Sequence, residues 1–385
     1  MAISIEYFGP PGIPDGPKAA VLNSRQSKYP VGTDRWIPAA GRAIACLADR
    51  DFVLVSSLGM NTWELALTFA ARLQMRVIVV VSESIVDRRR FANDIFRRFH
   101  LSPARTGFYF MTVSPGKTIK ASWRARDAVV IDLADQLFPI SIRPKGLLAA
   151  LIEANKEKVD SSFTMSYDNT SRPRPKYQMT ELNPDVNWDQ WLIHFTRSSS
   201  GSWPDETDYN FYSDLIESTS DFCRSAWRTV MHIVTTGIIY GHSKKIRGGH
   251  PVVPFALITP DSIKNLFRYR SRFLNPGFEP YGIAISKQSA IDLGIRPVIY
   301  GAMDIFDHLS EDDKPYFQNQ GSYNSQWTIE HEWRRLGDFY LDLLPPDRIR
   351  IIVPTLHEIP RPENPALPPI IPLFLSPDSA RPVDS

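Results

Sequence analysis

Short apolar runs alternate with longer amphipathic segments over the first 150 residues of the chain. Runs of four or five apolar residues are typical of strands that are buried on both faces of a parallel sheet. Such runs stand at 19–22, 52–55, 77–81 and 128–131. Between and after them, the spacing of apolar residues predicts helices over about 35–49, 61–74, 84–99 and 143–156. This alternation predicts a doubly wound α/β domain.

The pattern changes after this region. Ser, Asn, Pro, Arg and Lys dominate from about 160 to 185 and the apolar periodicity disappears, which indicates a linker or a long surface excursion. The chain then continues with a long helical pattern over 209–236 and with short strand patterns, which together predict an α+β domain. The strands are expected at 252–257, 282–285, 297–300 and 349–354.

These patterns divide the chain into two domains, in keeping with its length of 385 residues. We predict an α/β Rossmann-like N-terminal domain over 1–156, a linker over 157–185 and an α+β C-terminal domain over 186–358. Residues 359–385 are rich in proline and are expected to form an extended tail, with 370–375 as its apolar patch.

The composition excludes several classes of protein. Hydrophobic residues make up 43% and charged residues 22%, as in ordinary globular proteins, and the formal net charge of +2 gives no strong field toward nucleic acid or a membrane. Cys46 and Cys223 fall in different predicted domains, which argues against disulfides and cysteine-rich zinc sites and favours the cytoplasm. No signal peptide is expected at the N-terminus, and the apolar run 77–81 is too short to span a bilayer.

Polar residues follow the first two predicted parallel strands, where an open α/β sheet offers helix N-termini to anionic ligands. Hydroxyl and cationic side chains after the first strand can hold a phosphate, and Lys28 lies close to them in sequence. A glycine after the second strand permits close approach of a ligand to the backbone. The candidate nucleotide-binding residues are Ser24, Arg25, Ser57, Gly59 and Met60.

A structural interpretation of the second segment stays open. Asn61 and Glu64 have the spacing of a capping box, which alone would account for both residues, and Ser56 and Ser57 can simply end a strand. Neither a GxGxxG nor a GxxxxGK[ST] motif is present, so spacing and position give only a general expectation of phosphate or nucleotide binding.

The segments LNSRQSKYPVGTDRWI, LVSSLGMNTWELAL, RDAVVIDLAD and SIRPKG resemble SLOG-type Rossmannoid domains. These domains are related to DNA processing protein A and to cytokinin-activating phosphoribohydrolases. The resemblance covers most of 18–150 and implies binding of a nucleotide or a nucleotide-derived signal at the five candidate residues. The phosphoribohydrolases carry a PGGxGTxxE signature, whereas this chain has SLGMNTWE, in which only Thr62 and Glu64 echo it. The resemblance therefore favours sensing over hydrolysis.

The predicted C-terminal domain contains three stretches that combine aromatic and polar residues. If the first of them is a strand, His194 and Thr196 share one face of it. If the last is a strand, Glu330, Glu332 and Arg334 share one face. The three stretches are WLIHFTR at 191–197, IRGGHPVVPF at 246–255 and QWTIEHEWR at 326–334.

Two carboxylates beside an arginine can stabilise the cationic transition state that forms when a nicotinamide–ribose bond is cleaved. In this hypothesis His194 and Thr196 hold the ribose and the nicotinamide amide of NAD, and Arg247 holds the pyrophosphate. The alternative is a half-exposed strand with a structural ladder of Glu and Arg side chains. No metal site is expected, because the histidines show no HExxH or comparable spacing, and neither GxSxG nor a cysteine-nucleophile signature is present.

The same region resembles an uncharacterised domain found near phage-defence genes, which is similar in turn to the ADP-ribosyltransferase superfamily, including its DNA-targeting toxins. The segments LIHFTR, TGIIYGHSKKIRGGHPVVPFALITP, YGIAISKQSAIDLGIRPVIYG and WTIEHEWR carry it over about 188–356. The long insertion 198–230 departs from the compact form of that family. The resemblance implies a first-strand histidine, a second-block arginine, an aromatic residue on nicotinamide and a closing E-x-E, which correspond to His194, Arg247, Tyr281, Glu330 and Glu332.

Three hypotheses about function follow. In the favoured one, the N-terminal half binds a nucleotide signal and gates use of NAD as a substrate by the C-terminal half in anti-phage defence, with NAD depleted or a nucleic acid or protein as acceptor. In the second, the protein is a non-catalytic nucleotide or single-stranded DNA binder with a degenerate C-terminal recognition domain. In the third, the N-terminal half is a nucleoside or nucleotide hydrolase that uses Glu64.

These hypotheses make different structural predictions. An NAD-consuming enzyme predicts that Glu332 lines a pocket with His194, whereas a binding module predicts that Glu332 lies on an open strand face. A homo-oligomer is compatible with all three hypotheses, and none of them requires a membrane.

Overall fold

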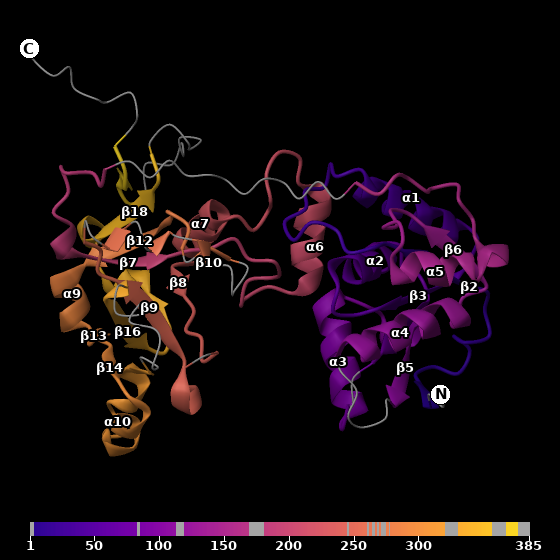
Figure 1. Cartoon of the computed structure of the whole chain (residues 1–385), viewed down its shortest axis with the longest axis horizontal. Coiled ribbons are helices and arrows are strands. Elements are labelled where there is room, and N and C mark those ends of the chain that lie inside the picture. The colour runs from indigo at the N-terminus through magenta and orange to yellow at the C-terminus, as the bar shows by residue number, and fades with distance from the viewer. Residues whose placement is uncertain are drawn as a thin grey trace, which may run out of the picture. The chain divides into compact units, whose positions relative to one another are not determined.

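The chain forms two compact units in a computed structural model, and each unit is discontinuous in sequence (Figure 1). Unit 1 comprises Met1–Pro173 and Ser200–Cys223, and unit 2 comprises Arg174–Ser199 and Arg224–Ser385. The structure describes residues 4–82, 85–112, 119–168, 181–244, 246–259, 262–263, 266–267, 269–270, 275–276, 278–319, 330–355 and 367–375.

A six-stranded sheet with the order β1-β5-β4-β3-β2-β6 organises unit 1. All neighbouring strands are parallel except the edge strand β1, which is antiparallel to β5. The doubly wound α/β fold predicted for the N-terminal half is therefore confirmed. The strands are β1 (Ser4–Phe8), β2 (Lys18–Leu22), β3 (Val53–Ser57), β4 (Val77–Val81), β5 (Thr106–Thr112) and β6 (Gln136–Pro139).

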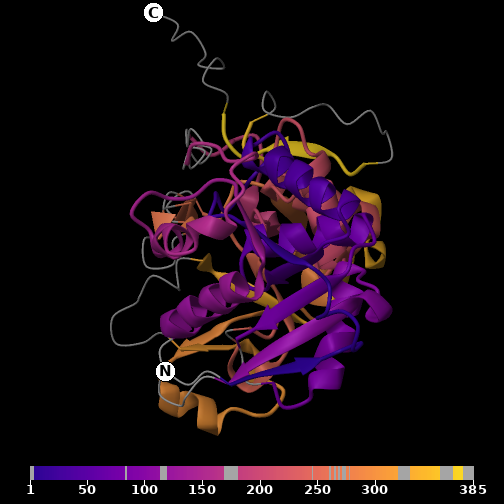
Figure 2. The ribbon, with the colours of Figure 1, turned by 90° about the vertical axis from the view of Figure 1, so that its right-hand side faces the viewer.

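Helices cover both faces of this sheet (Figure 2). In β4, Val77, Val79 and Val81 belong to the core on the side of α1, α2 and α3, and Ile78 and Val80 to the core on the side of α4 and α5. Because both faces are buried, the strands read as unbroken apolar runs. The helices are α1 (Trp36–Asp49), α2 (Asn61–Arg72), α3 (Arg88–Phe99), α4 (Ile119–Leu133) and α5 (Leu147–Glu153).

The strand predicted at 128–131 is wrong, because these residues form the last part of α4. Val129, Val130 and Ile131 are apolar because this part of the helix packs on the sheet, and a short apolar run does not distinguish a strand from a buried helix. The strands β1, β5 and β6 were not predicted.

Two helix boundaries also differ from the prediction. The helix α3 begins at Arg88 because the carboxylate of Asp87 accepts a hydrogen bond from the backbone N–H of Arg90 at 2.9 Å. Residue 84, where this helix was predicted to begin, lies outside the described residues. The helix predicted over 143–156 is limited to α5, followed by a 3₁₀ turn at Lys156–Lys158.

The strand order of unit 1 reverses at β2. From β2 the chain moves in one direction through β3 and β4 to β5, and α4 then returns it to β6 on the opposite side of β2. Connections that leave neighbouring strands in opposite directions open a crevice beyond the carboxyl ends of those strands. The fold thus predicts a ligand site between the ends of β2 and β6.

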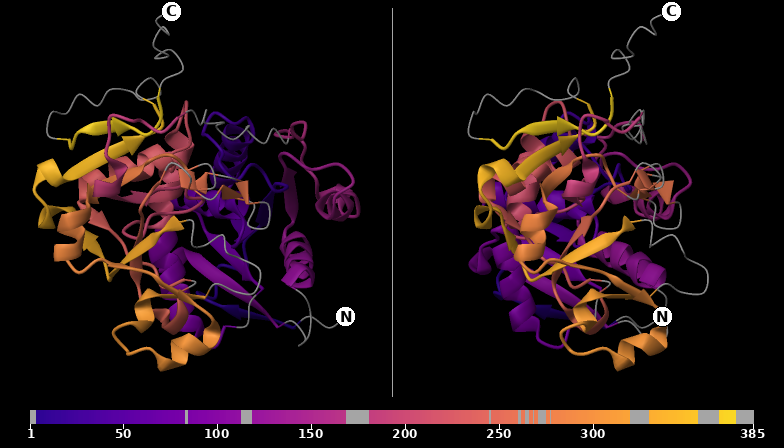
Figure 3. Two further views of the ribbon diagram at one scale, coloured as in Figure 1. Left: turned by 60° about the vertical axis from the view of Figure 1, so that its left-hand side comes forward. Right: turned by 90° about the vertical axis from the view of Figure 1, so that its left-hand side faces the viewer.

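Unit 2 is built on a seven-stranded sheet with the order β13-β16-β9-β7-β12-β18-β19 (Figure 3). Its neighbouring strands are antiparallel except β18 and β19, and with its helices it confirms the predicted α+β class. The sheet strands are β7 (Trp191–Phe195), β9 (Val252–Ala256), β12 (Gly282–Ser286), β13 (Arg296–Pro297), β16 (Glu332–Leu336), β18 (Ile349–Val353) and β19 (Ile370–Pro372).

Smaller elements complete unit 2. The helices α7 and α9 contribute to the core on one face of the sheet, and three short strand pairs lie outside it. These elements are α7 (Ala226–Thr236), α9 (Lys287–Asp292), α10 (Met303–His308), β8 (Ile238–Ile239) with β17 (Phe339–Tyr340), β10 (Tyr269–Arg270) with β11 (Asn275–Pro276), and β14 (Ile299–Gly301) with β15 (Phe317–Asn319).

The single long helix predicted over 209–236 is wrong. It is replaced by two helices, α6 (Asp208–Glu217) and α7, which belong to different units. Thr207 and Ser225 cap their N-termini, because each hydroxyl accepts a hydrogen bond from a backbone N–H three residues later. These two caps mark a break that the apolar periodicity does not reveal.

The units also divide the chain differently from the predicted domains. Residues 200–223, assigned from the sequence to the C-terminal domain, belong to unit 1. In the predicted linker, Val159 and Met165 form isolated parallel bridges with Leu137 and Ser141, so this segment follows the edge strand β6. In the predicted tail, Ile370–Pro372 form β19. No helix in the described part of the chain is long and apolar enough to cross a membrane.

Candidate functional site

A pocket of about 150 Å³ lies in unit 1, between the segments that follow β2 and β6. This is the crevice at which the strand order reverses. The N-terminus of α1 forms the wall opposite the strand ends. The lining residues are Gln26, Ser27, Thr33, Asp34, Arg35, Trp36, Ser141, Met165 and Asp168.

Hydrogen bonds tie the two strand ends together beneath the pocket. The side-chain oxygen of the buried Asn23 accepts from the backbone N–H of Ser141 at 3.1 Å, and the Gln26 amide donates to the same oxygen at 3.4 Å. The backbone N–H of Ser24 donates to the Ser141 carbonyl at 3.0 Å, and the Ser24 hydroxyl accepts from the backbone N–H of Arg143 at 2.8 Å. These bonds fix the pocket floor before any ligand arrives.

The N-terminus of α1 gives the pocket its electrostatic character. Arg35 stands at the N-cap position with an exposed side chain and makes no side-chain capping bond, and the first turn contains no acidic residue. The backbone N–H of Ile37 already donates to the Asp34 carbonyl at 2.8 Å and position 38 is a proline, so it is the helix dipole and the Arg35 guanidinium that favour an anion at this position. Asp34 and Asp168 add carboxylates, and Ser27 and Thr33 add hydroxyls, so the lining can bind both an anion and hydroxyl groups.

The pocket lies close to, but not on, the predicted residues Ser24 and Arg25. The Ser24 hydroxyl is engaged by Arg143, and Arg25 is exposed with its carbonyl accepting from the Tyr167 hydroxyl at 3.2 Å. Their chain neighbours Gln26 and Ser27 line the pocket instead. The residues at the start of α1 and after β6 were missed, because only the strand order shows that they meet at one edge.

The second predicted segment has a structural role in this unit. Ser57 is buried and its hydroxyl donates to the Val80 carbonyl at 2.7 Å, so it ends β3 as the structural interpretation expects. Gly59 has a φ of +85°, and its backbone N–H donates to a carboxylate oxygen of Glu64 at 2.9 Å. Glu64 therefore reaches back as in a capping box, but the N-cap residue is Met60 rather than Asn61.

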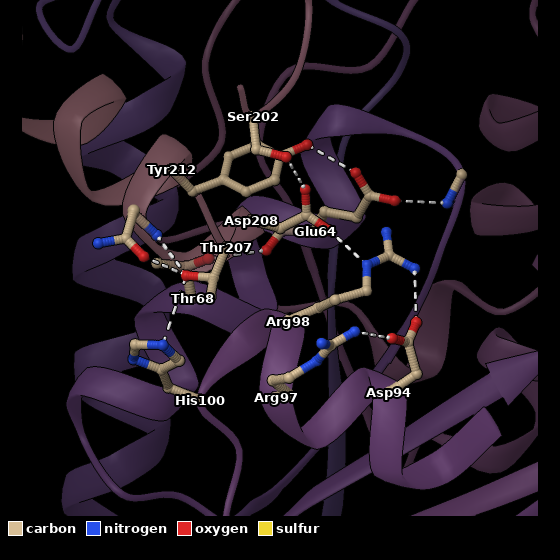
Figure 4. A network of polar contacts seen from close by, with 12 residues as sticks. Glu64, Thr68, Asp94, Arg97, Arg98, His100, Ser202, Thr207, Asp208 and Tyr212 are labelled. Carbon is tan, nitrogen blue, oxygen red and sulfur yellow. Dashed lines mark hydrogen bonds and ion pairs between the residues drawn. The ribbon is translucent and has the colours of Figure 1, made fainter. Parts of the chain in front are cut away.

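Glu64 is closed in by a side chain from α6 (Figure 4). The Tyr212 hydroxyl donates to its second carboxylate oxygen at 2.7 Å. Burial raises the pKa of Glu64 above its usual value, although the hydrogen bonds from Tyr212 and Gly59 oppose this, and burial also raises the pKa of Tyr212. Glu64, which echoes the phosphoribohydrolase signature, thus accepts hydrogen bonds from Gly59 and Tyr212 and is covered by α6.

The sheet register separates the two central residues of the predicted NAD site. Glu332 pairs with Ala256, and Ala256 pairs with Ile193 in the next strand. Side chains that pair directly across antiparallel strands lie on the same face, so Glu332 shares a face with Ile193. His194 is the next residue along β7 and therefore points to the opposite face. The sheet gives Glu332 and His194 no common pocket.

The half-buried His194 packs against the core on its own face. Its ring lies edge-on to Phe255 at a centroid distance of 5.9 Å, and Nδ1 makes a hydrogen bond with the Pro254 carbonyl at 2.8 Å, which fixes the proton on Nδ1. Burial lowers the pKa of His194 to about 4, against the hydrogen bond to Pro254, which raises it. The imidazole is therefore neutral at pH 7.

Glu332 and Arg334 share a face of β16, as predicted, and form a salt bridge of 2.8 Å. The Arg334 guanidinium is buried and also donates to the carbonyls of Pro315 and Phe317 and to the Gln318 side chain, at 2.8–3.0 Å. This pattern satisfies a buried cation and indicates a structural role.

The predicted strand over 326–334 begins only at Glu332. Residues 326–329 lie outside the described ones, and His331 has a φ of +41°, which breaks the alternation between Glu330 and Glu332. Glu330 is buried before the strand begins, and the backbone N–H of Glu332 donates to the Tyr300 hydroxyl at 3.1 Å.

The remaining predicted NAD-binding residues also make contacts within unit 2. The Thr196 hydroxyl donates to the Ala226 carbonyl at 2.9 Å, and its backbone N–H donates to the Tyr281 carbonyl at 2.9 Å. The Tyr281 ring packs near Trp227, at 6.2 Å between centroids. Arg247 is exposed and lies over the Phe306 ring at 4.5 Å. Thr196 and Tyr281 are thus neighbours, whereas these contacts place Arg247 beside α10. Within the described ranges, no cluster of His, Cys, Asp and Glu side chains is arranged to hold a metal ion.

No model of a known protein family matches the chain, and no curated protein matches it. Among solved structures, DNA processing protein A from Helicobacter pylori, described as binding single-stranded DNA, is 18% identical, with 40% of this chain and 69% of that chain covered and a TM-score of 0.32. DNA processing protein A from Streptococcus pneumoniae is 18% identical, with 40% and 53% covered and a TM-score of 0.31.

Replacement of Glu64 by Gln should change how the stability of unit 1 depends on pH. The native state holds the Glu64 proton more tightly than the unfolded chain, so the free energy of unfolding falls as the pH rises above the ordinary carboxyl range toward the raised native pKa. Glu64→Gln removes this loss and keeps hydrogen-bonding atoms for Gly59 and Tyr212. Urea unfolding should give a higher midpoint for the variant at pH 7 and a smaller difference at pH 4; a difference independent of pH would contradict the assignment.

Replacement of His194 by Asn tests the opposite sign of pH dependence in unit 2. Because the pKa of His194 is lowered to about 4, the unfolded chain binds the extra proton first, and stability is lost as the pH falls from 6.5 toward 4. His194→Asn retains a donor for the Pro254 carbonyl without a titrating ring. Thermal unfolding across this pH range should decline less steeply for the variant, and equal slopes would show that His194 does not titrate as described.

Replacement of Arg334 by Met should destabilise unit 2 by about 3–5 kcal/mol, because it leaves the Glu332 carboxylate without its buried cation. The double variant Glu332→Gln/Arg334→Met should recover part of this loss. Guanidinium unfolding of the three proteins provides the comparison. Wild-type stability of Arg334→Met would contradict a structural role for this pair.

Proposed function

We propose that unit 1 binds a ribonucleotide in the pocket between the ends of β2 and β6, with its phosphate at the N-terminus of α1. The observation that supports this most is the coincidence of three features at one edge: a pocket, a reversal of strand order and a helix N-terminus that carries an exposed arginine. The binding role rests on this geometry and not on the similarity to solved structures.

The lining groups support a ribonucleotide over a simple anion. Arg35 and the positive end of the α1 dipole match a phosphate, whereas the carboxylates of Asp34 and Asp168 would repel it. Carboxylates in doubly wound folds accept hydrogen bonds from ribose hydroxyls, which gives these two residues a role. The pocket volume of about 150 Å³ is smaller than the roughly 300–1,000 Å³ of sites that enclose a whole ligand. We therefore expect it to hold the phosphate and sugar, with the base toward solvent.

Single-stranded DNA is the alternative occupant of the same pocket. It offers phosphates to Arg35 but lacks the 2′-hydroxyl that Asp34 or Asp168 would accept from, so these carboxylates favour the ribonucleotide. Preference for ribose over deoxyribose separates the two occupants.

Use of NAD by unit 2 and a part in anti-phage defence stay predictions of the sequence resemblance. The opposite faces of Glu332 and His194 give an NAD site formed by both no geometric support.

Reversal of the Arg35 charge tests the proposed site. Arg35→Glu places a carboxylate where the phosphate is expected, while an acidic residue at a helix N-terminus does not disturb the helix. Arg42→Glu makes the same change on an exposed residue of the same helix, away from the pocket. Calorimetric titration with AMP should show binding to the wild type and to Arg42→Glu, and at least about tenfold weaker binding to Arg35→Glu, since lost charge-assisted bonds cost roughly 1.5–3 kcal/mol.

The same titration with dAMP and with a thymidine oligonucleotide identifies the occupant. Weaker binding of dAMP than of AMP supports the ribose contacts. If the oligonucleotide binds more tightly than AMP, and Arg35→Glu abolishes this binding, single-stranded DNA is the occupant of the pocket. Equal binding of AMP to all three proteins would refute the site.

A further inference from the structure

The segment 200–223, here called the arm, belongs to unit 1 although the chain on both sides of it belongs to unit 2. It leaves unit 2 after Ser199, contains α6, and returns to unit 2 at Arg224. The domain division predicted from the sequence places the arm with unit 2, because the residues of unit 1 that contact the arm are distant from it in sequence.

The arm is firmly packed in unit 1. Phe211, Tyr212 and Leu215 of α6 are buried in the core that includes α2 and α3. Polar contacts surround this apolar face: Arg98 forms a salt bridge with Asp208 at 2.6 Å, and Tyr212 donates to Glu64 (Figure 4). Arg72 forms a further salt bridge with Glu217 at 2.7 Å.

The end of the arm rests against the back of the pocket wall. The backbone N–H of Gly32 donates to the Ser218 hydroxyl at 2.9 Å, and the hydroxyl of Thr33, which lines the pocket, donates to the Thr219 carbonyl at 3.3 Å. The approach is close enough to require glycine, because a Cβ at position 32 would lie 2.3 Å from the carbonyl oxygen of Ile216. The loop before α1 thus lines the pocket and contacts the arm.

Both ends of the arm are fastened within unit 2. The backbone N–H of Ser199 donates to the Arg224 carbonyl at 2.9 Å, so the outgoing and returning chains are paired. The Thr196 hydroxyl, one residue beyond β7, donates to the carbonyl of Ala226, the first residue of α7. A shift of the arm therefore acts on the end of a central strand and the start of a helix.

The geometry points to the arm as the element that communicates occupancy of the pocket to unit 2. The docked arm supports the wall at Gly32 and Thr33 in its binding form, and a ribonucleotide in the pocket stabilises the docked arm in return. Such coupling is reciprocal by linkage, so weakening the docking must weaken nucleotide binding. This inference rests on the proposed nucleotide binding and adds its regulation.

The test combines amide hydrogen exchange with calorimetry on the full chain, with AMP as the probe. In the wild type, AMP should slow exchange in α6 and at Ser199, whose N–H joins the two ends of the arm. The variant Tyr212→Ala/Leu215→Ala loosens the arm without changing a residue that lines the pocket, and should bind AMP at least about fivefold more weakly. Exchange in α1 to α4 of the same sample reports whether the rest of unit 1 remains folded.

A second variant approaches the contact from the pocket side. Gly32→Val should displace the arm and speed exchange in α6, whereas Gly12→Val, at a glycine with open space around it, should change neither exchange nor AMP affinity. Normal AMP affinity in the arm variant, with fast exchange in α6, would overturn the coupling but leave the nucleotide site intact. An arm that responds to AMP while Ser199 does not would overturn communication to unit 2. Absence of AMP binding to the wild type would refute the proposed function and the coupling together.

Discussion

The reversal of strand order on the two sides of β2 determines where unit 1 can form a ligand pocket. Parallel strands need crossover connections, and each crossover covers one face of the sheet. The chain leaves β2 toward β3 on one side and reaches β6 on the other side of β2. The connections after β2 and β6 therefore diverge, and a crevice opens beyond the ends of these two strands. Asn23 and Gln26 then bind these ends together, and the N-terminus of α1 closes the third side. The pocket is a consequence of topology more than of any motif.

The arm adds a second level of organisation to this unit. Its helix α6 buries three side chains in the core of unit 1 and covers Glu64. The Glu64 carboxylate is therefore hydrogen-bonded to Tyr212 and not available to a ligand. A hydrolytic role for Glu64 would need the arm to leave. The same docking places Ser218 and Thr219 behind the pocket wall. Stability of the arm and the shape of the pocket are therefore linked through Gly32 and Thr33.

Much of the fold could be predicted from the sequence, because strands buried on both faces leave unbroken apolar runs such as 77–81. The run at 128–131 shows the limit of this signal, since an apolar segment that packs on a sheet reads alike as helix or strand. The arm was placed in the wrong half because its partners, Glu64 and Arg98, are more than a hundred residues away.

The sequence predicted the position of the candidate site to within a few residues, at Ser24 and Arg25, because a polar segment after a buried strand is a local signal. Its other wall, at Thr33–Trp36 and Ser141, depends on strand order, which the local pattern does not contain. In unit 2 the alternation correctly put Glu332 and Arg334 on one face. Only the register of β16, β9 and β7 shows that His194 lies on the other face.

Photo-crosslinking with 8-azido-AMP, followed by mass-spectrometric mapping of the adducts, shows where unit 1 holds a nucleotide. We expect adducts in the segments 26–36, 141 or 165–168 that excess AMP suppresses, because the base should lie at the mouth of this pocket. Adducts concentrated in unit 2, near Glu332 or Arg247, or adducts that AMP does not suppress, would contradict binding at this pocket.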